Sequence, residues 1–188
     1  EHIRRDAHLF EIASLAVGGA IRASEIALAG EPAFGLIRPP GHHASPNSCW
    51  GFCYFNNIAI AIKRLIQSRE IGNALIVDFD LHFGDGTSNT FAGDANVTYH
   101  HMGARPRELE SFLSATGDFD MLGVSAGFDR GLADWGGTLS DAGYEQIGGL
   151  LKRFSNRESK GRRFAVLEGG YNHKSLGLSI LSFLRGFR

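Results

Sequence analysis

Residues 74–86 read Ala-Leu-Ile-Val-Asp-Phe-Asp-Leu-His-Phe-Gly-Asp-Gly. The apolar run Ala74–Phe79 passes directly into a segment of aspartate, histidine and glycine. A short run that is apolar without alternation is typical of a strand buried on both faces, as in a parallel sheet. Because other stretches of the chain show the same order, an apolar run and then a polar loop, this pattern decides the expected fold.

The other apolar runs, and the amphipathic stretches between them, complete the predicted architecture. The runs are Ala33–Ile37, Val97–Tyr99, Met121–Ser125 and Phe164–Leu167. The amphipathic stretches predict helices at about Asp6–Ala29, Phe55–Ser68, Pro106–Thr116, Ser140–Phe154 and Lys174–Leu184. Strands that alternate with helices form βαβ units, so the sequence predicts an α/β fold, a parallel sheet with helices on both faces.

The composition suits one globular domain over residues 1–188 and excludes several classes of protein. Of the 188 residues, 43% are hydrophobic, enough for a single core. The formal net charge of −1 leaves no basic field for nucleic acid or for a membrane surface. The 25 glycines are scattered, which excludes collagen and flexible linkers and favours an enzyme with elaborate loops at its strand ends.

Cysteine usage and the lack of a targeting signal bear on location. Cys49 and Cys53 are too few for a disulfide framework, so we interpret both as reduced and expect a cytoplasmic protein. No apolar run approaches the ~20 residues that span a bilayer, and no apolar stretch near the N-terminus forms a signal peptide. Because the chain begins at Glu1 rather than at methionine, we expect the domain to be N-terminally incomplete.

Every segment that is rich in reactive side chains comes directly after a predicted strand. In chain order these segments are Arg38–His43, Asp80–Gly86, His100-His101, Gly127–Asp129 and Glu168–Tyr171. The carboxyl ends of parallel strands meet at one edge of the sheet, and open α/β sheets bind their ligands at that edge. The sequence therefore predicts one functional site built by five loops.

Two carboxylates and an imidazole alternate after the second strand. Asp78, Asp80 and His82 share one face of an extended chain, where they repel or lack partners unless a cation lies among them. Asp129, a lone acid after the fourth strand, would join Asp80 and His82 as a third ligand and leave an open position for water, as catalytic zinc sites do. The alternative is a solvated strand end, with Asp129 as the N-cap of the next turn.

Two histidines and a tyrosine are suited to catalysis beside such a metal. Asp78 and Asp85, which the metal does not need, could orient His42 and His43 as a general base and a general acid or electrostatic partner. Tyr171, which follows two glycines, could donate a hydrogen bond to a carbonyl oxygen that becomes anionic. The alternatives are a pair of surface histidines and an ordinary buried tyrosine.

Five longer motifs contain these residues. They are Arg38-Pro-Pro-Gly-His-His-Ala44, Gly51-Phe-Cys-Tyr-Phe-Asn-Asn57, Asp78-Phe-Asp-Leu-His-Phe-Gly-Asp-Gly-Thr87, Val124-Ser-Ala-Gly-Phe-Asp129 and Leu167-Glu-Gly-Gly-Tyr-Asn172. Together and in this order they closely resemble the histone deacetylase family, with its prokaryotic deacetylases, acetoin-utilisation proteins and acetylpolyamine amidohydrolases. The resemblance runs from about Leu9 to Gly186, looks most like the class II and prokaryotic branch, and implies the arginase–deacetylase fold.

The resemblance also implies two kinds of ion. It makes Asp80, His82 and Asp129 the ligands of zinc, one ion per chain, because position 131 is Gly where the related two-metal arginases carry a second acid. It further implies a structural monovalent cation, K⁺ or Na⁺, beneath the metal strand. The residues that match that site are Asp78, Asp80, His82, Thr98 and Tyr99.

The catalytic roles follow from the same resemblance. His43 is implied to be the general base, oriented by Asp85, and His42 the electrostatic partner or acid, oriented by Asp78. Tyr171 is implied to polarise the acetyl carbonyl. The residues implied to contact the acyl-lysine substrate are Gly51 and Phe52.

Two segments of the family have no counterpart in this sequence. One is the N-terminal strand with its rim loop, and the other is a long segment that would lie between Met102 and Glu108 and supply a channel wall. We expect either a compact variant with an open site or part of a longer protein.

The leading functional hypothesis is zinc-dependent removal of acetyl or other acyl groups from the ε-amine of lysine in proteins. The first alternative is deacetylation of acetylpolyamines or other small amides, and the second is a non-catalytic module that binds a metal or acyl-lysine. No residue identifies histones as the substrate or sets the oligomeric state.

Overall fold

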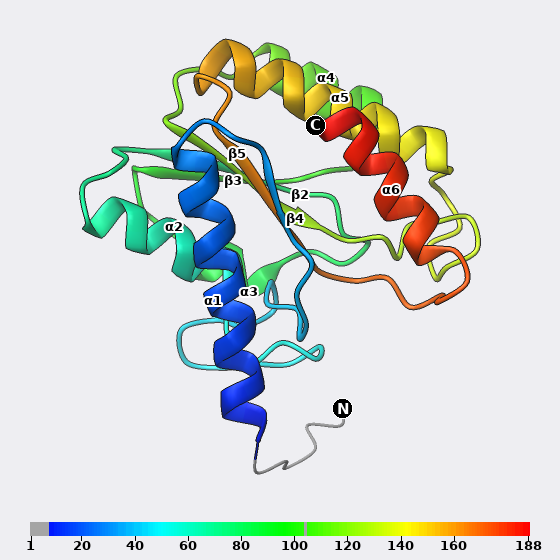
Figure 1. Ribbon diagram of the computed structural model, residues 1–188, viewed down its shortest axis with the longest axis horizontal. Coiled ribbons are helices and arrows are strands. Elements are labelled where there is room, and N and C mark those ends of the chain that lie inside the picture. The colour runs from blue at the N-terminus through cyan, green and yellow to red at the C-terminus, as the bar shows by residue number, and fades with distance from the viewer. Residues whose placement is uncertain (1–7, 104) are drawn as a thin grey trace.

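A single parallel sheet forms the centre of the computed structural model, which describes residues 8–103 and 105–188. The strands lie in the order β1-β5-β4-β2-β3 (Figure 1), and each pair of neighbours is parallel. They span Ala33–Gly35 (β1), Ala74–Asp78 (β2), Val97–His101 (β3), Met121–Ala126 (β4) and Arg163–Leu167 (β5). The predicted fold class is confirmed.

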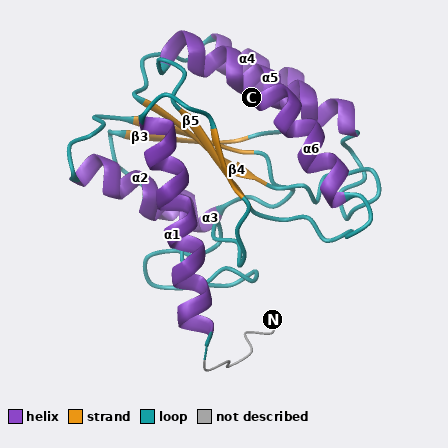
Figure 2. Ribbon diagram, viewed as in Figure 1, coloured by secondary structure: helices purple, strands orange, loops and turns teal. Residues whose placement is uncertain are grey.

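Helices cover both faces of the sheet, as the sequence predicts (Figure 2). Their bounds are Leu9–Leu28 (α1), Asn57–Gln67 (α2), Asp85–Thr90 (α3), Pro106–Ser114 (α4), Asp141–Glu158 (α5) and Leu176–Phe187 (α6). The helices α1 and α2 pack on one face, and α4, α5 and α6 pack on the other. Among the described residues, no helix has the length and apolar character needed to cross a membrane.

Two separate cores form because the side chains of each strand alternate across the sheet. In β2, Ala74 and Ile76 pack with residues of α1 and α2, whereas Leu75 and Val77 pack with residues of α5 and α6. All four side chains are fully buried, so the strand is apolar throughout. The apolar pattern ends with Asp78, the last residue of β2, so the core itself fixes where the polar segment begins.

The predicted strands and helices are all present, but several ends differ. The observed ends that differ by three residues or more are Leu9 for α1, Glu158 for α5 and Phe187 for α6. The predicted helix start at Asp6 lies outside the described residues. The six-residue helix α3 was not predicted, because its glycine, serine, asparagine and threonines are weak helix formers.

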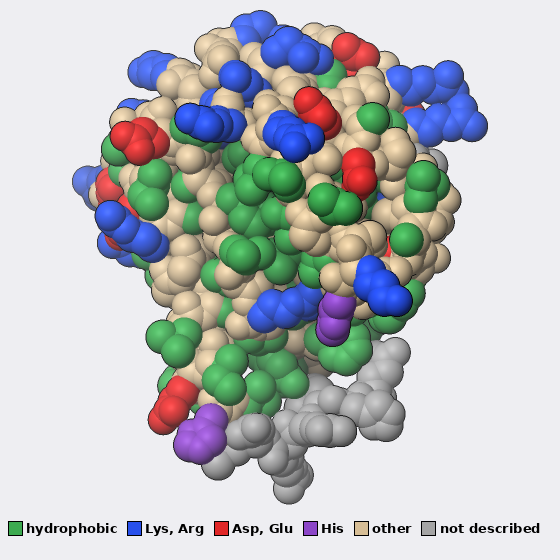
Figure 3. All heavy atoms as spheres, turned by 45° about the vertical axis from the view of Figure 1, so that its right-hand side comes forward, with side chains coloured by type: hydrophobic (Ala, Val, Ile, Leu, Met, Phe, Trp, Pro, Cys, Tyr) green, Lys and Arg blue, Asp and Glu red, His purple; other side chains and the backbone are tan. Residues whose placement is uncertain are grey.

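The outer surface carries charges of both signs. On the face shown in Figure 3, lysine and arginine side chains are interspersed with aspartates and glutamates. This agrees with the formal net charge of −1.

The helices α5 and α6 approach closely because glycines lie at their contact. A Cβ atom on Gly148 would clash with the carbonyl oxygen of Phe183 and would lie 2.7 Å from the amide nitrogen of Phe187. A Cβ atom on Gly186 would lie 2.7 Å from the amide nitrogen of Gly149. These obstacles are backbone atoms, so a larger residue must push the two helices apart.

The substitution Gly148→Ala is therefore expected to lower the free energy of unfolding by about 1–3 kcal/mol, the usual cost of overpacking. The matched control is Gly18→Ala in α1, where no atom lies within 4 Å of the added Cβ. That change is expected to raise the free energy of unfolding by about 0.5–1 kcal/mol, because alanine favours a helix interior. Urea unfolding measures both, and an unchanged midpoint for Gly148→Ala would contradict the close contact of α5 with α6.

Candidate metal centre and active site

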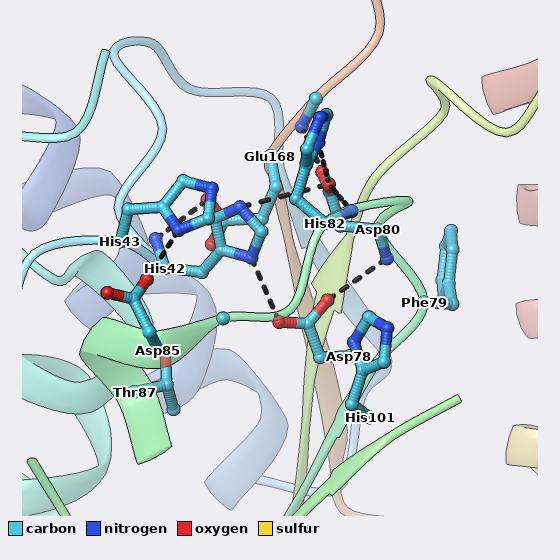
Figure 4. A network of polar contacts seen from close by, with 12 residues as sticks. His42, His43, Asp78, Phe79, Asp80, His82, Asp85, Thr87, His101 and Glu168 are labelled. Atoms are coloured by element: carbon cyan, nitrogen blue, oxygen red, sulfur yellow. Dashed lines mark hydrogen bonds and ion pairs between the residues drawn. The ribbon is translucent and has the colours of Figure 1, made fainter. Parts of the chain in front are cut away.

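The first candidate residues lie just beyond the end of β2, at the carboxyl edge of the sheet (Figure 4). A carboxylate oxygen of Asp78 accepts a hydrogen bond from the amide of Asp80 at 3.0 Å, and Asp80 does the same for the amide of His82 at 2.9 Å. The extended strand expected to reach His82 is thus wrong, because β2 stops at Asp78. Two consecutive turns, each closed by an aspartate, shape residues 78–82, which we call the metal segment.

Asp80, His82 and Asp129 come together as predicted. Each offers one ligand atom, and these atoms all lie within 4.8 Å of one another. Backbone amides hold the two carboxylates in place, since Gly169 donates to Asp80 at 2.8 Å and Leu81 donates to Asp129 at 2.9 Å. Both aspartates are buried, whereas the imidazole of His82 is partly exposed and gives access from solvent.

The donor set fits a divalent cation. Burial and the charge of Asp80 raise the pKa of Asp129, because two carboxylates face each other at close range. Burial alone would raise the pKa of Asp80, but hydrogen bonds from His82 outweigh it and lower that pKa. The buried Oδ2 of Asp129 has no hydrogen bond among the described residues, although Nδ1 of His82 lies 3.0 Å away. A cation bound by two carboxylates and an imidazole would remove this repulsion, and zinc accepts these ligands.

His42 is held as a charged imidazolium. Its Nδ1 lies 3.0 Å from a carboxylate oxygen of Asp78, and both side chains are buried. Burial by itself would lower the pKa of His42, but the charge and hydrogen bond of Asp78 outweigh burial and raise the pKa to about 10. His42 therefore carries a proton at neutral pH, which suits an electrostatic partner or an acid and excludes a free base.

His43 is held in the opposite state. Its Nδ1 lies 2.6 Å from Asp85, whose other oxygen accepts a hydrogen bond from the indole of Trp50 at 2.9 Å. The imidazole of His43 lies between those of His42 and Trp50, with ring centroids 4.1 Å and 4.0 Å away. Burial and the charge of His42 lower the pKa of His43 despite Asp85. A neutral ring that donates its Nδ1 proton to Asp85 leaves Nε2 as a proton acceptor.

The histidine loop is fixed to β5 by Glu168, the first residue after that strand. One carboxylate oxygen of Glu168 accepts hydrogen bonds from the amides of Gly41 and His42, at 2.7 Å and 3.1 Å. Glu168 is fully buried, and burial, partly offset by the charge of His42, raises its pKa to about 7. Glu168 thus positions the two histidines through their backbone.

Tyr171 lies on a loop that several contacts fix. Its amide donates to the carboxylate of Asp134 at 2.8 Å, and its ring stacks on Trp135 with centroids 3.9 Å apart. The guanidinium of Arg38 donates to the carbonyl oxygen of Gly170 at 2.7 Å. Burial, and then the charges of the two aspartates of the metal centre, raise the pKa of Tyr171, so its hydroxyl keeps its proton and can donate it in a hydrogen bond.

Gly51 lies beside His43, and Phe52 lies beside Tyr171. Both have positive φ, 60° and 65°, and a Cβ atom on Gly51 would lie 2.5 Å from the imidazole of His43. The ring of Phe52 is 54% exposed and its centroid lies 6.1 Å from that of Tyr171. Phe52 therefore lies at the rim of the site.

The residues expected to hold a monovalent cation are only partly brought together. The hydroxyl of Tyr99 donates to Asp78 at 3.0 Å, as a neighbour of the metal segment should. Thr98 is exposed and pairs with Leu75, three positions before His101, which is the partner of Asp78. The structure does not bring Thr98 into the cluster.

Comparison with known proteins agrees with this geometry. The family described as "Histone deacetylase domain" matches residues 3–112, more than half of the chain. The chain belongs to the histone deacetylase family. A "Probable deacetylase" of Methanothermobacter thermautotrophicus is 33% identical and matches 94% of this chain and 65% of its own length. Histone deacetylase 18 of Arabidopsis thaliana is 30% identical, over 92% of this chain and 32% of its own length.

Two solved structures share the fold. The acetylpolyamine aminohydrolase of Burkholderia pseudomallei has a TM-score of 0.80 and 26% identity, and the match covers 96% of this chain and 63% of that protein. The HDA15 HD domain has a TM-score of 0.78 and 25% identity, over 93% of this chain and 62% of that domain. The chain thus spans less than two thirds of the length of these family members.

Four residues that shape the site were not given a role by the sequence analysis. They are Trp50, Arg130, Trp135 and Glu168. A signal existed for two of them, because a charged residue directly after a buried strand or a metal-ligating aspartate, such as Glu168 or Arg130, needs a specific partner. The two tryptophans lie in loops whose path no local pattern predicts.

Proposed function

We propose that this protein is a zinc-dependent deacetylase that removes acetyl groups from the ε-amine of lysine in proteins. The observation that carries the proposal is the presence of two histidine–aspartate pairs, His42 with Asp78 and His43 with Asp85, beside the cluster of Asp80, His82 and Asp129. Membership of the histone deacetylase family supports the same reaction class.

The cluster of Asp80, His82 and Asp129 would hold the zinc ion, which when bound supplies a Lewis acid for the substrate carbonyl and makes a nearby water more acidic. The protein's own residues supply the proton transfers. Nε2 of His43 accepts the proton of the attacking water, while Asp85 holds the ring in the required tautomer. The positive charge of His42 stabilises the negative charge that builds up next to it. The protonated His43 then gives its proton to the amine nitrogen as the C–N bond breaks, which releases acetate and the free amine.

Tyr171 acts on the other side of the reacting carbonyl. Its hydroxyl donates a hydrogen bond to the carbonyl oxygen, and this bond strengthens as that oxygen becomes anionic. The stack of Tyr171 on Trp135 and the hydrogen bond to Asp134 fix the position of the phenol in advance. Phe52, at the rim, would contact the methylene groups of the lysine side chain.

An acetylated polyamine is the second candidate substrate. It is favoured by the similarity in fold to an acetylpolyamine aminohydrolase. Either substrate presents an acetylated primary amine on a linear chain, so the same chemistry serves both. The two free cysteines, Cys49 and Cys53, support a reducing compartment, and the cytoplasm remains part of this proposal.

The test is acetate release from an acetyl-lysine peptide and from an N-acetylated diamine, after zinc is added to the purified chain. We expect turnover of the peptide with a kcat/KM at least about tenfold above that of the diamine, a difference of about 1.4 kcal/mol in transition-state binding. The reverse ratio would make the polyamine the substrate. Stoichiometric zinc binding without turnover of either would instead identify a non-catalytic module.

The variant Tyr171→Phe separates enzymatic turnover from background hydrolysis. It is expected to lower kcat about 100- to 1,000-fold, the usual cost of removing one donor to a developing oxyanion, with little change in KM. The stack on Trp135 remains in this variant, so the loop should keep its position. A variant with full kcat would exclude Tyr171 from the mechanism.

A further inference from the structure

Arg130 has an unusual environment for a buried arginine. It follows Asp129 directly and is only 6% exposed, yet in the described part of the chain no carboxylate lies within ion-pair distance of it. Its Nε donates to the carbonyl oxygens of Phe79 at 3.0 Å and Asp80 at 3.1 Å. Its Nη2 donates to the carbonyl oxygen of Met102 at 3.0 Å. One guanidinium therefore joins the metal segment after β2 to the residue that follows β3.

The surroundings of Arg130 require a positive charge. The carboxylates buried at this edge of the sheet are those of Asp78, Asp80, Asp129 and Glu168. Buried carboxylates repel one another and are costly unless cations and hydrogen-bond donors compensate them. The imidazole of His42 lies 3.0 Å from the carboxylate of Asp78, and the guanidinium of Arg130 donates to the backbone carbonyl of Asp80.

A monovalent cation in this region would need the same oxygen atoms. K⁺ and Na⁺ are bound in proteins by carbonyl and carboxylate oxygens. The carbonyls of Phe79, Asp80 and Met102 already accept hydrogen bonds from Arg130, and that of Asp78 accepts one from the amide of Met102 at 2.7 Å. An ion that shared these oxygens would lie within a few ångströms of a guanidinium, and like charges at that distance repel strongly in a buried site.

The carboxylate of Asp78 is likewise already engaged in hydrogen bonds. It accepts hydrogen bonds from the amide of Asp80 and the hydroxyl of Tyr99, and it binds His42. Thr98, another residue expected to bind the ion, pairs with Leu75 and lies outside the cluster. The residues present in this chain therefore do not fit the K⁺ or Na⁺ site that the resemblance to the family implies.

We propose that Arg130 is a built-in cation that takes the place of a monovalent ion beneath the metal segment and positions the backbone of Asp80. The guanidinium donates hydrogen bonds to three carbonyl oxygens at the ends of two strands, where a bound cation would instead be coordinated by such oxygens. Because it is covalently attached next to Asp129, it is always present, so the folded chain should not depend on K⁺ or Na⁺.

Thermal unfolding of the zinc-free chain in KCl, NaCl or tetramethylammonium chloride at equal ionic strength tests this directly. Tetramethylammonium is too large for a carbonyl-lined ion site, so it shows the effect of salt alone. The proposal predicts that the three midpoints agree within about 1 °C, which for a chain of this size is under about half a kcal/mol. A clearly higher midpoint in KCl or NaCl would overturn the proposal, because the wild-type chain would then bind the ion.

The variant Arg130→Met removes the charge and keeps most of the volume. Its midpoint in tetramethylammonium chloride is expected to fall by about 10 °C. In KCl or NaCl the midpoint should recover by about 3 °C or more, because the vacated carbonyl oxygens can bind the ion. A folded variant that responds equally to all three salts would overturn the proposal, since the carbonyls would then not form a cation site.

Arg163 supplies the matched control. Its guanidinium is also buried, at 4% exposure, and donates to the carbonyl oxygens of Gly161, Phe187 and Arg188. It lies at the start of β5, at the opposite end of the strands from the metal segment. Arg163→Met is expected to lower the unfolding midpoint without making it depend on K⁺. If K⁺ raised the midpoint of Arg163→Met as well, the K⁺ response of Arg130→Met would not be evidence for a cation site at Arg130.

If neither variant folds, the comparison of the wild-type unfolding midpoints in the three salts still tests the proposal. All readouts are unfolding midpoints without zinc or substrate. The outcome of these measurements therefore does not depend on whether the protein is a deacetylase.

Discussion

Replacing His43 with alanine is expected to lower kcat for an acetyl-lysine peptide about 100- to 10,000-fold, the range that a positioned general base contributes. His43 is the neutral member of the histidine pair, because burial and the charge of His42 lower its pKa. Its Nδ1 is engaged by Asp85 at 2.6 Å, so only Nε2 can take a proton from water. His42 cannot replace it, since its pKa is raised to about 10 and it is already protonated.

Zinc binding must be measured alongside the rate. His43 is not one of the three clustered ligands, so His43→Ala should bind zinc with unchanged stoichiometry. The matched control is His100→Ala, which removes a half-buried histidine that stacks on Phe112 and lies outside the site. That control should keep its turnover. If His43→Ala retained most of the wild-type kcat, another group would have to be the base.

The sequence predicted the sheet because burial on both faces leaves a clear mark. Residues such as Leu75, Ile76 and Val77 alternate between two cores, so the strand must be apolar at every position. The helix α3 left no such mark, because hydrogen bonds to its loop hold it rather than its own propensity. One example is the hydrogen bond that the side chain of Asn56 donates to Thr87 at 3.1 Å.

In the candidate site, too, some residue positions could be predicted from the sequence and others could not. The sequence could indicate that Asp80, His82 and Asp129 lie near one another, because all three come within four residues of a strand end that the core fixes. Thr98 lies away from Asp78 because β3 runs two residues further than the apolar run indicated, to His101. The strand end next to Asp78 is therefore formed by His101, and Thr98 lies back along the strand. Local sequence could not reveal this shift, because it depends on the register with β2.

Contacts between different loops of the site could not be predicted from local sequence patterns, for a different reason. Arg130 was not given a role, since its partners are backbone oxygens about 28 to 51 residues away in the chain. The hydrogen bond of Trp50 to Asp85 likewise joins two loops that only the folded sheet brings together. Sequence patterns report which residues come after strands, but not which loop crosses above another.

The substitution Asp129→Asn is expected to change stability in opposite directions with and without zinc. In the zinc-free chain it removes one of two carboxylates that repel each other, as the raised pKa of Asp129 indicates. The new amide can donate to Asp80, while its oxygen still accepts the hydrogen bond from Leu81. The zinc-free variant is therefore expected to be more stable than the zinc-free wild type, by about 1 kcal/mol or more.

When zinc is present, the wild type is expected to be more stable than Asp129→Asn. Zinc at about 100 times its dissociation constant should stabilise the wild type by about 2.7 kcal/mol, which raises its melting midpoint by about 5–10 °C. The variant has lost one of three ligands, so its midpoint should hardly respond to zinc and its deacetylation should be undetectable. Asp120→Asn, which changes an aspartate whose carboxylate accepts hydrogen bonds from the amides of Gly72 and Asn73, should keep the full zinc response. A zinc response in Asp129→Asn equal to that of the wild type would mean that the ion binds elsewhere, and the cluster of Asp80, His82 and Asp129 would lose its role.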